Sequence, residues 1–297
     1  MNPESLDKII LVVLVSLLFI AIAYTAYINM VNPRHTCNDT RSTRDEDERI
    51  VLVVNKSINE WREIYRKYVL YSDEMYKKHQ VIGGEYNLTQ LLRIISNANS
   101  SVVVRTFYFH DPIIDKYVVL KIVIPLFVVE LHIHDMPQWG SEPLMKEIGN
   151  ILKKYVEEYP SNYTEYRLAL IVLKIASQIR YKGEPSSYDA LLGIVYNEGN
   201  CETKTSLAID LAANVGLWSA FISTENHQYL AIAVDNPPPR LRRAFNFTWH
   251  NHTFYLADVA VNEGKPLFPI KPYPNSWIET IVAPFWEKTY SINKPLQ

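Results

Sequence analysis

The sequence predicts an α+β fold in which several helices precede the strands of a sheet. Two stretches, Glu142 to Tyr159 and Thr164 to Tyr181, carry apolar residues at spacings of three and four, as amphipathic helices do. A third helical pattern begins near Cys201 and ends at Gly216, because a glycine suits a helix C-terminus. Strand-like runs rich in β-branched and aromatic residues follow this helix. Helices in one block and strands in the next are typical of the α+β class.

Length and composition limit the classes of protein to consider. The chain has 297 residues, enough for one large domain or two smaller ones, and its formal net charge is −2. Without a basic excess, no nucleic-acid partner is expected. Of the two cysteines, Cys37 lies in a polar stretch, and we expect it to be unpaired or to form an intermolecular disulfide. A bond from Cys37 to Cys201 would disable the site described below.

An uncharged apolar segment from Ile9 to Ile28 predicts a transmembrane anchor, preceded by a short tail over residues 1–8. Twenty helical residues span about 30 Å, the thickness of a hydrocarbon core. Tyr24 and Tyr27 suit the interfacial belt at one end. The alternative is a cleaved signal peptide, since Ala21-Ile22-Ala23 matches a cleavage site. The run is longer than a signal core, so we expect a retained single-pass anchor.

Two signals disagree about the side of the membrane. Arg34, Arg41, Arg44 and Arg49 follow the apolar segment and only Lys8 precedes it, which favours a cytoplasmic domain. Seven Asn-x-Ser/Thr sequons favour the opposite side: Asn38, Asn55, Asn87, Asn99, Asn162, Asn246 and Asn251. Chance would give about two or three. The charge rule is weakest for long translocated domains, so we expect an extracytoplasmic glycoprotein domain at the cell membrane.

The rest of the chain divides into three parts. Residues 29–49 are polar and predict a linker. Residues 50–140 form an N-terminal region whose role is left open, and residues 141–297 form the domain that carries the candidate site. Two helices and then two strands are predicted in the N-terminal region: Ile50 to Gln80 and Leu88 to Ile95, then Val102 to Phe109 and Tyr117 to His134.

Cys201 is the candidate nucleophile. It follows the flexible turn Glu198-Gly199-Asn200 and stands at the start of a helix. Unpaired backbone N–H groups and the positive end of the helix dipole there favour a thiolate over a thiol. The alternative is a buried, inert cysteine, because free cysteine is among the most buried residue types. The polar neighbours favour an accessible helix start.

His227 and Asp258 are the candidate partners of this thiol. His227 begins the strand-like run that ends at Val234, and Asp258 ends the next one. Alternation places Asp258 on the same face as Phe254 and Leu256, where a carboxylate without a partner is costly. Cysteine, histidine and aspartate in this order suit a nucleophile, a base and a residue that orients the base.

With these residues the chain resembles the transglutaminase-like superfamily of papain-type cysteine enzymes, in the form found in predicted archaeal and bacterial proteases. The resemblance rests on Gly-x-Cys opening the core helix, a glycine near its end, a histidine starting one strand and an aspartate ending the next. It covers Glu142 to Pro269, about half of the chain. It implies a papain-like core, with the cysteine on a central helix packed against an antiparallel sheet, and a Cys201-His227-Asp258 triad.

Several other residues compete for roles in the site. His132 and His134 lie two apart and would share one face of a strand, but no third ligand is fixed, so we expect an exposed strand end and no metal. His250 and His252 are expected to be loop histidines that rival His227 as the base.

Residues near the helix start have expected roles as well. Glu202 and Lys204 are expected on a solvated face. The backbone N–H of Cys201 is the predicted first oxyanion donor. Gln178 and Tyr181 are weak candidates for the second donor, and core packing is favoured for Tyr181.

These expectations describe a membrane-anchored thiol enzyme, a cysteine peptidase or amidase or a transglutaminase-like acyltransferase. It would hydrolyse peptide or isopeptide bonds through a thioester, without a cofactor. The expected partner is a protein or peptide substrate, with a cell-envelope glycoprotein as one candidate. The alternative is a catalytically silent transglutaminase-like domain that binds envelope peptides or glycoproteins. The sequence leaves the choice between hydrolysis and acyl transfer open.

Overall fold

The computed structural model describes residues 49–80, 86–183, 189–260, 268–269 and 271–296. The predicted anchor over residues 9–28, nearly all of the linker, and Cys37 lie outside these residues. Within the described part of the chain, none of the helices combines the length and apolar character that crossing a membrane requires. Asp45–Gln297 forms one compact unit, and its mixture of helices and sheets confirms the predicted α+β class.

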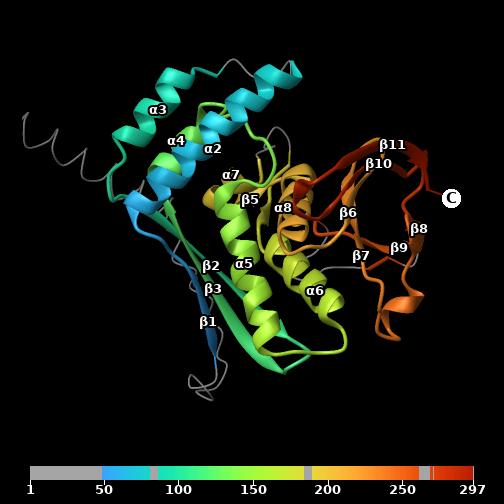
Figure 1. Ribbon diagram of the computed structural model, residues 1–297. Coiled ribbons are helices and arrows are strands. Elements are labelled where there is room, and N and C mark those ends of the chain that lie inside the picture. The colour runs from blue at the N-terminus through green and yellow to red at the C-terminus, as the bar shows by residue number, and fades with distance from the viewer. Residues whose placement is uncertain (1–48, 81–85, 184–188, 261–267, 270, 297) are drawn as a thin grey trace, which may run out of the picture. The chain divides into compact units, whose positions relative to one another are not determined.

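A three-stranded sheet begins this unit. It contains β1 (Ile50–Val54), β3 (Lys116–Pro125) and β2 (Val102–Asp111) in that spatial order. β1 runs parallel to β3, and β2 pairs with β3 antiparallel. In Figure 1 this sheet lies on one side of α5 (Pro143–Glu158), whose apolar stripe includes Leu144, Ile148 and Leu152.

Two predictions in this region are partly wrong. The expected helix over Ile50 to Gln80 starts instead with β1, and α2 (Ile58–His79) begins after a capping box formed by Ser57 and Glu60. The expected strand over Tyr117 to His134 ends at Pro125, because a proline cannot donate to the ladder. The following residues form α4 (Leu126–Ile133), which lies near α3 (Leu88–Ser96).

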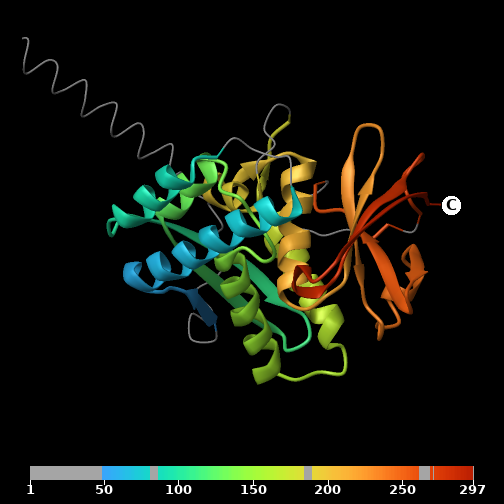
Figure 2. The same ribbon diagram turned by 45° about the horizontal axis from the view of Figure 1, so that its top comes forward.

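Helix α8 (Cys201–Asn214) is the centre of the unit. It packs against α5, α6 (Thr164–Ser177) and α7 (Ala190–Tyr196) on one side and against strands β6 (Ser219–Ser223) and β7 (Gln228–Ala233) on the other. Figures 1 and 2 both show it between the green helices and the orange and red strands. α5 approaches α8 closely at Gly149, where an added Cβ would lie 2.7 Å from the Cβ of Asn214.

The second sheet is antiparallel and curled, with six strands in the order β11-β10-β6-β7-β9-β8. The four strands not yet described are β8 (Asn246–Trp249), β9 (His252–Ala257), β10 (Trp277–Val282) and β11 (Thr289–Pro295). Alternation along β7 puts Leu230 and Ile232 in the core shared with α8, and Tyr229 and Ala231 in a second apolar cluster on the other face. The sheet is therefore apolar on both faces.

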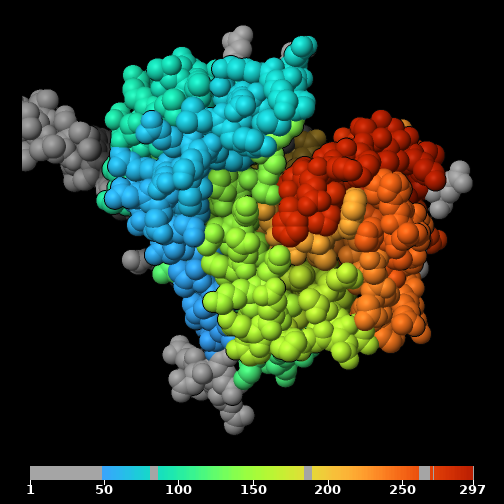
Figure 3. All heavy atoms as spheres, viewed as in Figure 1, coloured from blue at the N-terminus to red at the C-terminus, as the bar shows by residue number. Residues whose placement is uncertain are grey.

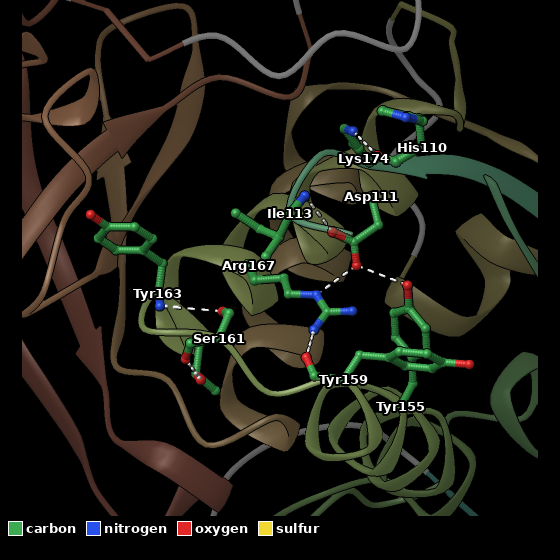
Figure 4. Close-up of polar contacts among 10 residues, drawn as sticks. His110, Asp111, Ile113, Tyr155, Tyr159, Ser161, Tyr163, Arg167 and Lys174 are labelled. Carbon is green, nitrogen blue, oxygen red and sulfur yellow. Dashed lines mark hydrogen bonds and ion pairs between the residues drawn. The ribbon is translucent and has the colours of Figure 1, made fainter. Parts of the chain in front are cut away.

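A buried ionic network ties β2 to the helices (Figure 4). Arg167 on α6 donates through Nε to Asp111 Oδ2 at 2.6 Å, and Tyr155 on α5 donates its hydroxyl to the same oxygen at 2.8 Å. Arg167 also donates to the carbonyl of Tyr159. Both side chains of the ion pair are fully buried. The network therefore fixes the end of β2 against two helices.

We expect Asp111→Asn to destabilise the protein by about 3–5 kcal/mol, because it leaves the buried Arg167 guanidinium without a counter-charge. Urea unfolding followed by circular dichroism measures this loss. Asp115→Asn is the matched control, since Asp115 pairs with His110 at an exposed position, and it should change stability by less than about 0.5 kcal/mol. Equal effects of the two substitutions would contradict the prediction.

Candidate active site

The start of α8 is shaped by close packing. Asn200 is the buried N-cap, and its side chain accepts from the backbone N–H of Thr203 at 3.1 Å. Added Cβ atoms at Gly199 and Gly193 would lie 2.4 and 2.5 Å from Cγ2 of Thr203, so only glycine fits at either position. This packing places Cys201 as the first residue of the helix, where the sequence predicted it.

The structure brings Cys201, His227 and Asp258 together. Nε2–H of His227 donates to Oδ2 of Asp258 at 2.8 Å, which leaves Nδ1 as the nitrogen for the sulfur. The thiol is half-buried and forms a hydrogen bond with His227. Thr205 on α8 donates to the carbonyl of Gln228 at 3.2 Å, which fixes the helix against the start of β7.

Strand register explains why the histidine and the aspartate meet. β7 and β9 pair antiparallel with Leu230 opposite Ala257. Continuing this register by one residue sets Asp258 opposite Tyr229, and His227 is then its diagonal neighbour on the same face. The two side chains therefore converge without any unusual backbone.

The pKa values of the thiol and the imidazole shift in opposite directions. The hydrogen bond from His227 lowers the pKa of Cys201, although burial opposes it, and the backbone N–H groups of Gln228 and Glu202 contribute. The hydrogen bond to Asp258 and then the one to Cys201 raise the pKa of His227 to about 9. Both shifts favour a thiolate and imidazolium pair near neutral pH.

Asp258 is held by more than the histidine. It is 1% exposed, and it accepts from the hydroxyl of Tyr273 at 2.9 Å and from the backbone N–H of Ala260 at 2.9 Å. The ring of Tyr273 is perpendicular to that of His227, with centroids 5.6 Å apart, and the ring of Tyr229 is stacked with it at 5.9 Å. Tyr273 was not predicted from the sequence, because it lies in a loop without periodicity, 15 residues after Asp258.

The expectation for Lys204 is wrong. Its side chain is buried, with the residue 2% exposed, and Nζ donates to the carbonyl of Ser177 at 3.2 Å. Burial lowers the pKa of Lys204 to about 8, and the charge of Asp258 partly offsets that shift. Glu202, in contrast, is exposed as expected.

The two candidates for a second oxyanion donor lie in different surroundings. Oε1 of Gln178 accepts from the backbone N–H of Tyr108, and Nε2 donates to the carbonyl of Lys174, so this side chain is occupied by structural contacts. Tyr181 is 54% exposed, and the expectation that it packs in the core is wrong. It pairs with Gly199 in the short strands β4 (Arg180–Tyr181) and β5 (Glu198–Gly199), two residues before Cys201.

The rival histidines lie elsewhere. His250 lies in the turn of the β8–β9 hairpin as expected, whereas His252 is not in a loop: it begins β9 and donates to Asp235 at 2.7 Å. His132 does not lie on an exposed strand end as expected: it is buried on α4 and contacts Asp189. His134 caps the end of α4. No group of three or more potential metal ligands occurs among the described residues.

Two hollows lie beside α8, and residues of this helix line both of them. One, of about 310 Å³, is lined by Glu202 and Gln228, the direct neighbours of Cys201 and His227. The other, of about 300 Å³, is acidic. The wall of both includes Trp286, in a short 3-10 turn (Pro284–Trp286) that reaches from the sheet to the helices. Figure 3 shows this red C-terminal segment lying against the green surface of α5. The ring of Phe285 packs beneath Nζ of Lys153 there.

The described fold and site define a mixed α+β protein with a cysteine, histidine and aspartate group at the start of its central helix. No protein-family model, curated protein or solved structure matches the chain.

We expect Cys201 to react with iodoacetamide at pH 6.5 faster than in His227→Ala by about tenfold or more, because one unit of pKa is a factor of ten in thiolate fraction. The lowered pKa of Cys201 keeps the thiolate populated as the pH falls. Mass spectrometry of the alkylated peptides across pH 5–9 measures the rate, with Cys37 as an internal reference. Equal labelling of both cysteines at every pH would contradict the assignment.

Proposed function

We propose that the protein is a membrane-anchored thiol enzyme that acts on amide bonds, with a papain-like core of the transglutaminase-like superfamily. One observation carries the proposal: the thiol at a helix start, the imidazole of His227 and the buried carboxylate of Asp258 form one hydrogen-bonded row. A central helix packed against an antiparallel sheet, with the histidine just before β7 and the aspartate just after the adjacent β9, supports the family assignment.

The proposed reaction has two steps. The Cys201 thiolate attacks the carbonyl carbon of the amide, the C–N bond breaks, and His227 gives the proton on Nδ1 to the leaving amine. The product is a thioester on the sulfur. Water then attacks the thioester carbon while His227 takes its proton, and the C–S bond breaks to give a carboxylic acid and the thiolate. An amine in place of water would give acyl transfer.

The two neighbours of the imidazole have distinct roles in these steps. Asp258 fixes the tautomer that directs Nδ1 to the sulfur, and it stabilises the imidazolium. Tyr273 and the N–H of Ala260 hold that carboxylate in place. We favour hydrolysis of a peptide or isopeptide bond in a protein or peptide substrate, and a cell-envelope glycoprotein is one candidate. The proposed steps use only these side chains and water.

The proposed location is the cell membrane, with the folded unit on the extracytoplasmic side and residues 9–28 as the anchor. Six of the seven sequons fall within the described residues, and all six asparagines are exposed to solvent: Asn55, Asn87, Asn99, Asn162, Asn246 and Asn251. Asn251 stands in the turn of the β8–β9 hairpin, where a glycan would project into solvent. Their accessibility supports this location.

We expect Asp258→Asn to keep the fold and to lower turnover by about three to four orders of magnitude, because the imidazole loses the carboxylate that orients it. The assay incubates the protein with a mixed peptide library in H₂¹⁸O, and mass spectrometry detects new carboxyl ends that carry ¹⁸O.

Cys201→Ala is the inactive control, and Asp235→Asn, which alters the carboxylate beside His252, should retain full activity. Products that persist in Cys201→Ala would remove the thiol from the mechanism. Full activity in Asp258→Asn would remove the carboxylate. If amide-linked adducts form without ¹⁸O uptake, acyl transfer replaces hydrolysis as the reaction.

We expect peptides that contain Asn162 and Asn251 to carry glycans in protein purified from its native membranes, since both side chains are accessible. Glycopeptide mass spectrometry before and after enzymatic deglycosylation measures this. Unmodified asparagines at all six sites, together with protection of the folded unit from protease added to intact cells, would place the domain in the cytoplasm.

A further inference from the structure

The three-stranded sheet has one buried face and one apolar face that is exposed. Alternation along β1, β2 and β3 turns every second side chain into the core that α5 covers and the intervening ones to solvent. Of the fifteen exposed large hydrophobic residues in the described chain, six occupy these outward positions: Val51, Val53, Val102, Val104, Tyr108 and Tyr117. Single residues of this kind are ordinary on a surface, but their concentration on one face indicates a surface that is covered in use.

Strand pairing brings these outward side chains next to one another. Val51 on β1 lies opposite Val119 on β3, which lies opposite Tyr108 on β2. Tyr117 pairs with His110, and their ring centroids are 5.0 Å apart. The outward pairs toward the other end of the sheet are apolar too: Val104 with Val123, and Val102 with Pro125. The outward face is therefore continuous across all three strands.

The polar residues on this face suit contact with lipid headgroups. No aspartate or glutamate stands at an outward position of the three strands, and Lys121 is the one lysine or arginine there. Asp115, in the turn between β2 and β3, pairs with His110 at 2.9 Å. A lysine can cover apolar surface with its methylene stem while its ammonium reaches the level of the phosphates. Anionic lipid attracts that charge.

The sequence of the chain brings a bilayer within reach of this face. The predicted anchor ends at Ile28 and β1 begins at Ile50, so residues 29–49 separate them. A chain of this length reaches at most about 70 Å. Figure 1 shows the start of β1 and the turn between β2 and β3 at the same end of the sheet. Tyr108 and Tyr117 lie near this end, and tyrosine is enriched where a membrane meets water.

The sequons leave the outward face free. None of the six exposed sequon asparagines occupies an outward position of the three strands. Asn55 follows β1 and Asn99 precedes β2, so both stand at the end of the sheet opposite to Tyr108 and Tyr117. Asn162 lies in the loop after α5, the helix that covers the inner face. Glycans at these positions would not cover the outward face.

We propose that the outward face of β1, β2 and β3 lies against the lipid bilayer, with Tyr108 and Tyr117 at the level of the headgroups. This inference rests on the membrane anchor of the proposed function. α5 contacts both β1 and α8, and Figure 1 shows it between them. Docking therefore turns the helix that carries the thiol away from the bilayer. The proposed enzyme then acts on peptides that lie outside the lipid.

A fluorescent reporter measures how close this face lies to the lipid. The full chain carries Cys37→Ala and Cys201→Ala, and an added Tyr117→Cys is labelled with an NBD dye. The protein is placed in nanodiscs of equimolar phosphatidylcholine and phosphatidylglycerol, in which some of the lipid carries a doxyl quencher next to its headgroup. We expect about twofold or more stronger quenching than for the same dye at Tyr71→Cys, an exposed position on α2, because only the former lies in the interface.

Charges placed on the face should detach it. Val51→Asp with Val104→Asp should lower the quenching at position 117 to the level of the α2 position, because a carboxylate is costly to remove from water. Both side chains are exposed, so the substitutions leave the core intact. Leu70→Asp with Ile133→Asp, at exposed positions on α2 and α4, is the matched control and should leave the quenching unchanged.

Three results would overturn the proposal. The first is equal quenching at the two dye positions, and the second is quenching that survives the two aspartates on the face. The third is a blue shift of the dye that does not depend on the doxyl lipid and grows with the number of protein copies per nanodisc. That result would assign the face to a second copy of the chain.

Failure of the anchor is distinguishable from failure of the docking. Alkaline carbonate applied to native membranes should leave the protein in the pellet if residues 9–28 span the bilayer. Release by carbonate would overturn both the proposed location and the docking. Retention together with an unquenched dye would overturn the docking alone, and turnover of the peptide library is measured independently of both.

Discussion

The hydrogen bond from His227 to Asp258 is the interaction on which the rest of the site depends. It joins the start of β7 to the end of β9 at 2.8 Å, and the carboxylate is almost completely buried. A buried charge is tolerated only with partners, and here the imidazole, a tyrosine hydroxyl and a backbone N–H supply them. Because Nε2 donates to the carboxylate, the ring is oriented so that Nδ1 is the nitrogen that interacts with the sulfur of Cys201.

The helices and the curled sheet of the unit position different residues of the site. The helices hold α8, with Lys204 and Asn200 buried among them, so the start of this helix has little freedom to move. The curled sheet holds the imidazole and the carboxylate at adjacent strand ends. The 3-10 turn before β11 connects the sheet to the helices: Ser141 donates to the carbonyl of Phe285, and the backbone at Phe285 and Trp286 has positive φ values of 56° and 57°. Bulky residues keep a positive φ only when surrounding contacts hold the backbone in that conformation.

The parts of the fold with regular periodicity were predictable from the sequence, and so was the site they position. Helices α5, α6 and α8 begin within a residue of the predicted starts. Alternation placed Asp258 on a buried face, and the family resemblance pointed to His227 as its partner, which the hydrogen bond between them matches. The failures have physical causes. Leu126 to Ile133 is mostly apolar, with Glu130 and His132 as its only polar residues, so its pattern does not separate a buried helix from a strand. The burial of Lys204, the position of Tyr273 and the acidic hollow arise from contacts between segments far apart in the chain, which no local pattern encodes.

The methyl group of Thr203 has a consequence for which substitutions the active-site helix can tolerate. This methyl group packs against Gly193 and Gly199, in the space that a Cβ atom would occupy at either position. The place of the nucleophile is thus set by steric fit two residues along the helix, in addition to the polar contacts of the sulfur. A larger side chain would push the first turn of α8 away from α7 and β5, and serine, which lacks the methyl group, would leave room for that turn to shift. Precision at the sulfur therefore requires a side chain of one size at position 203.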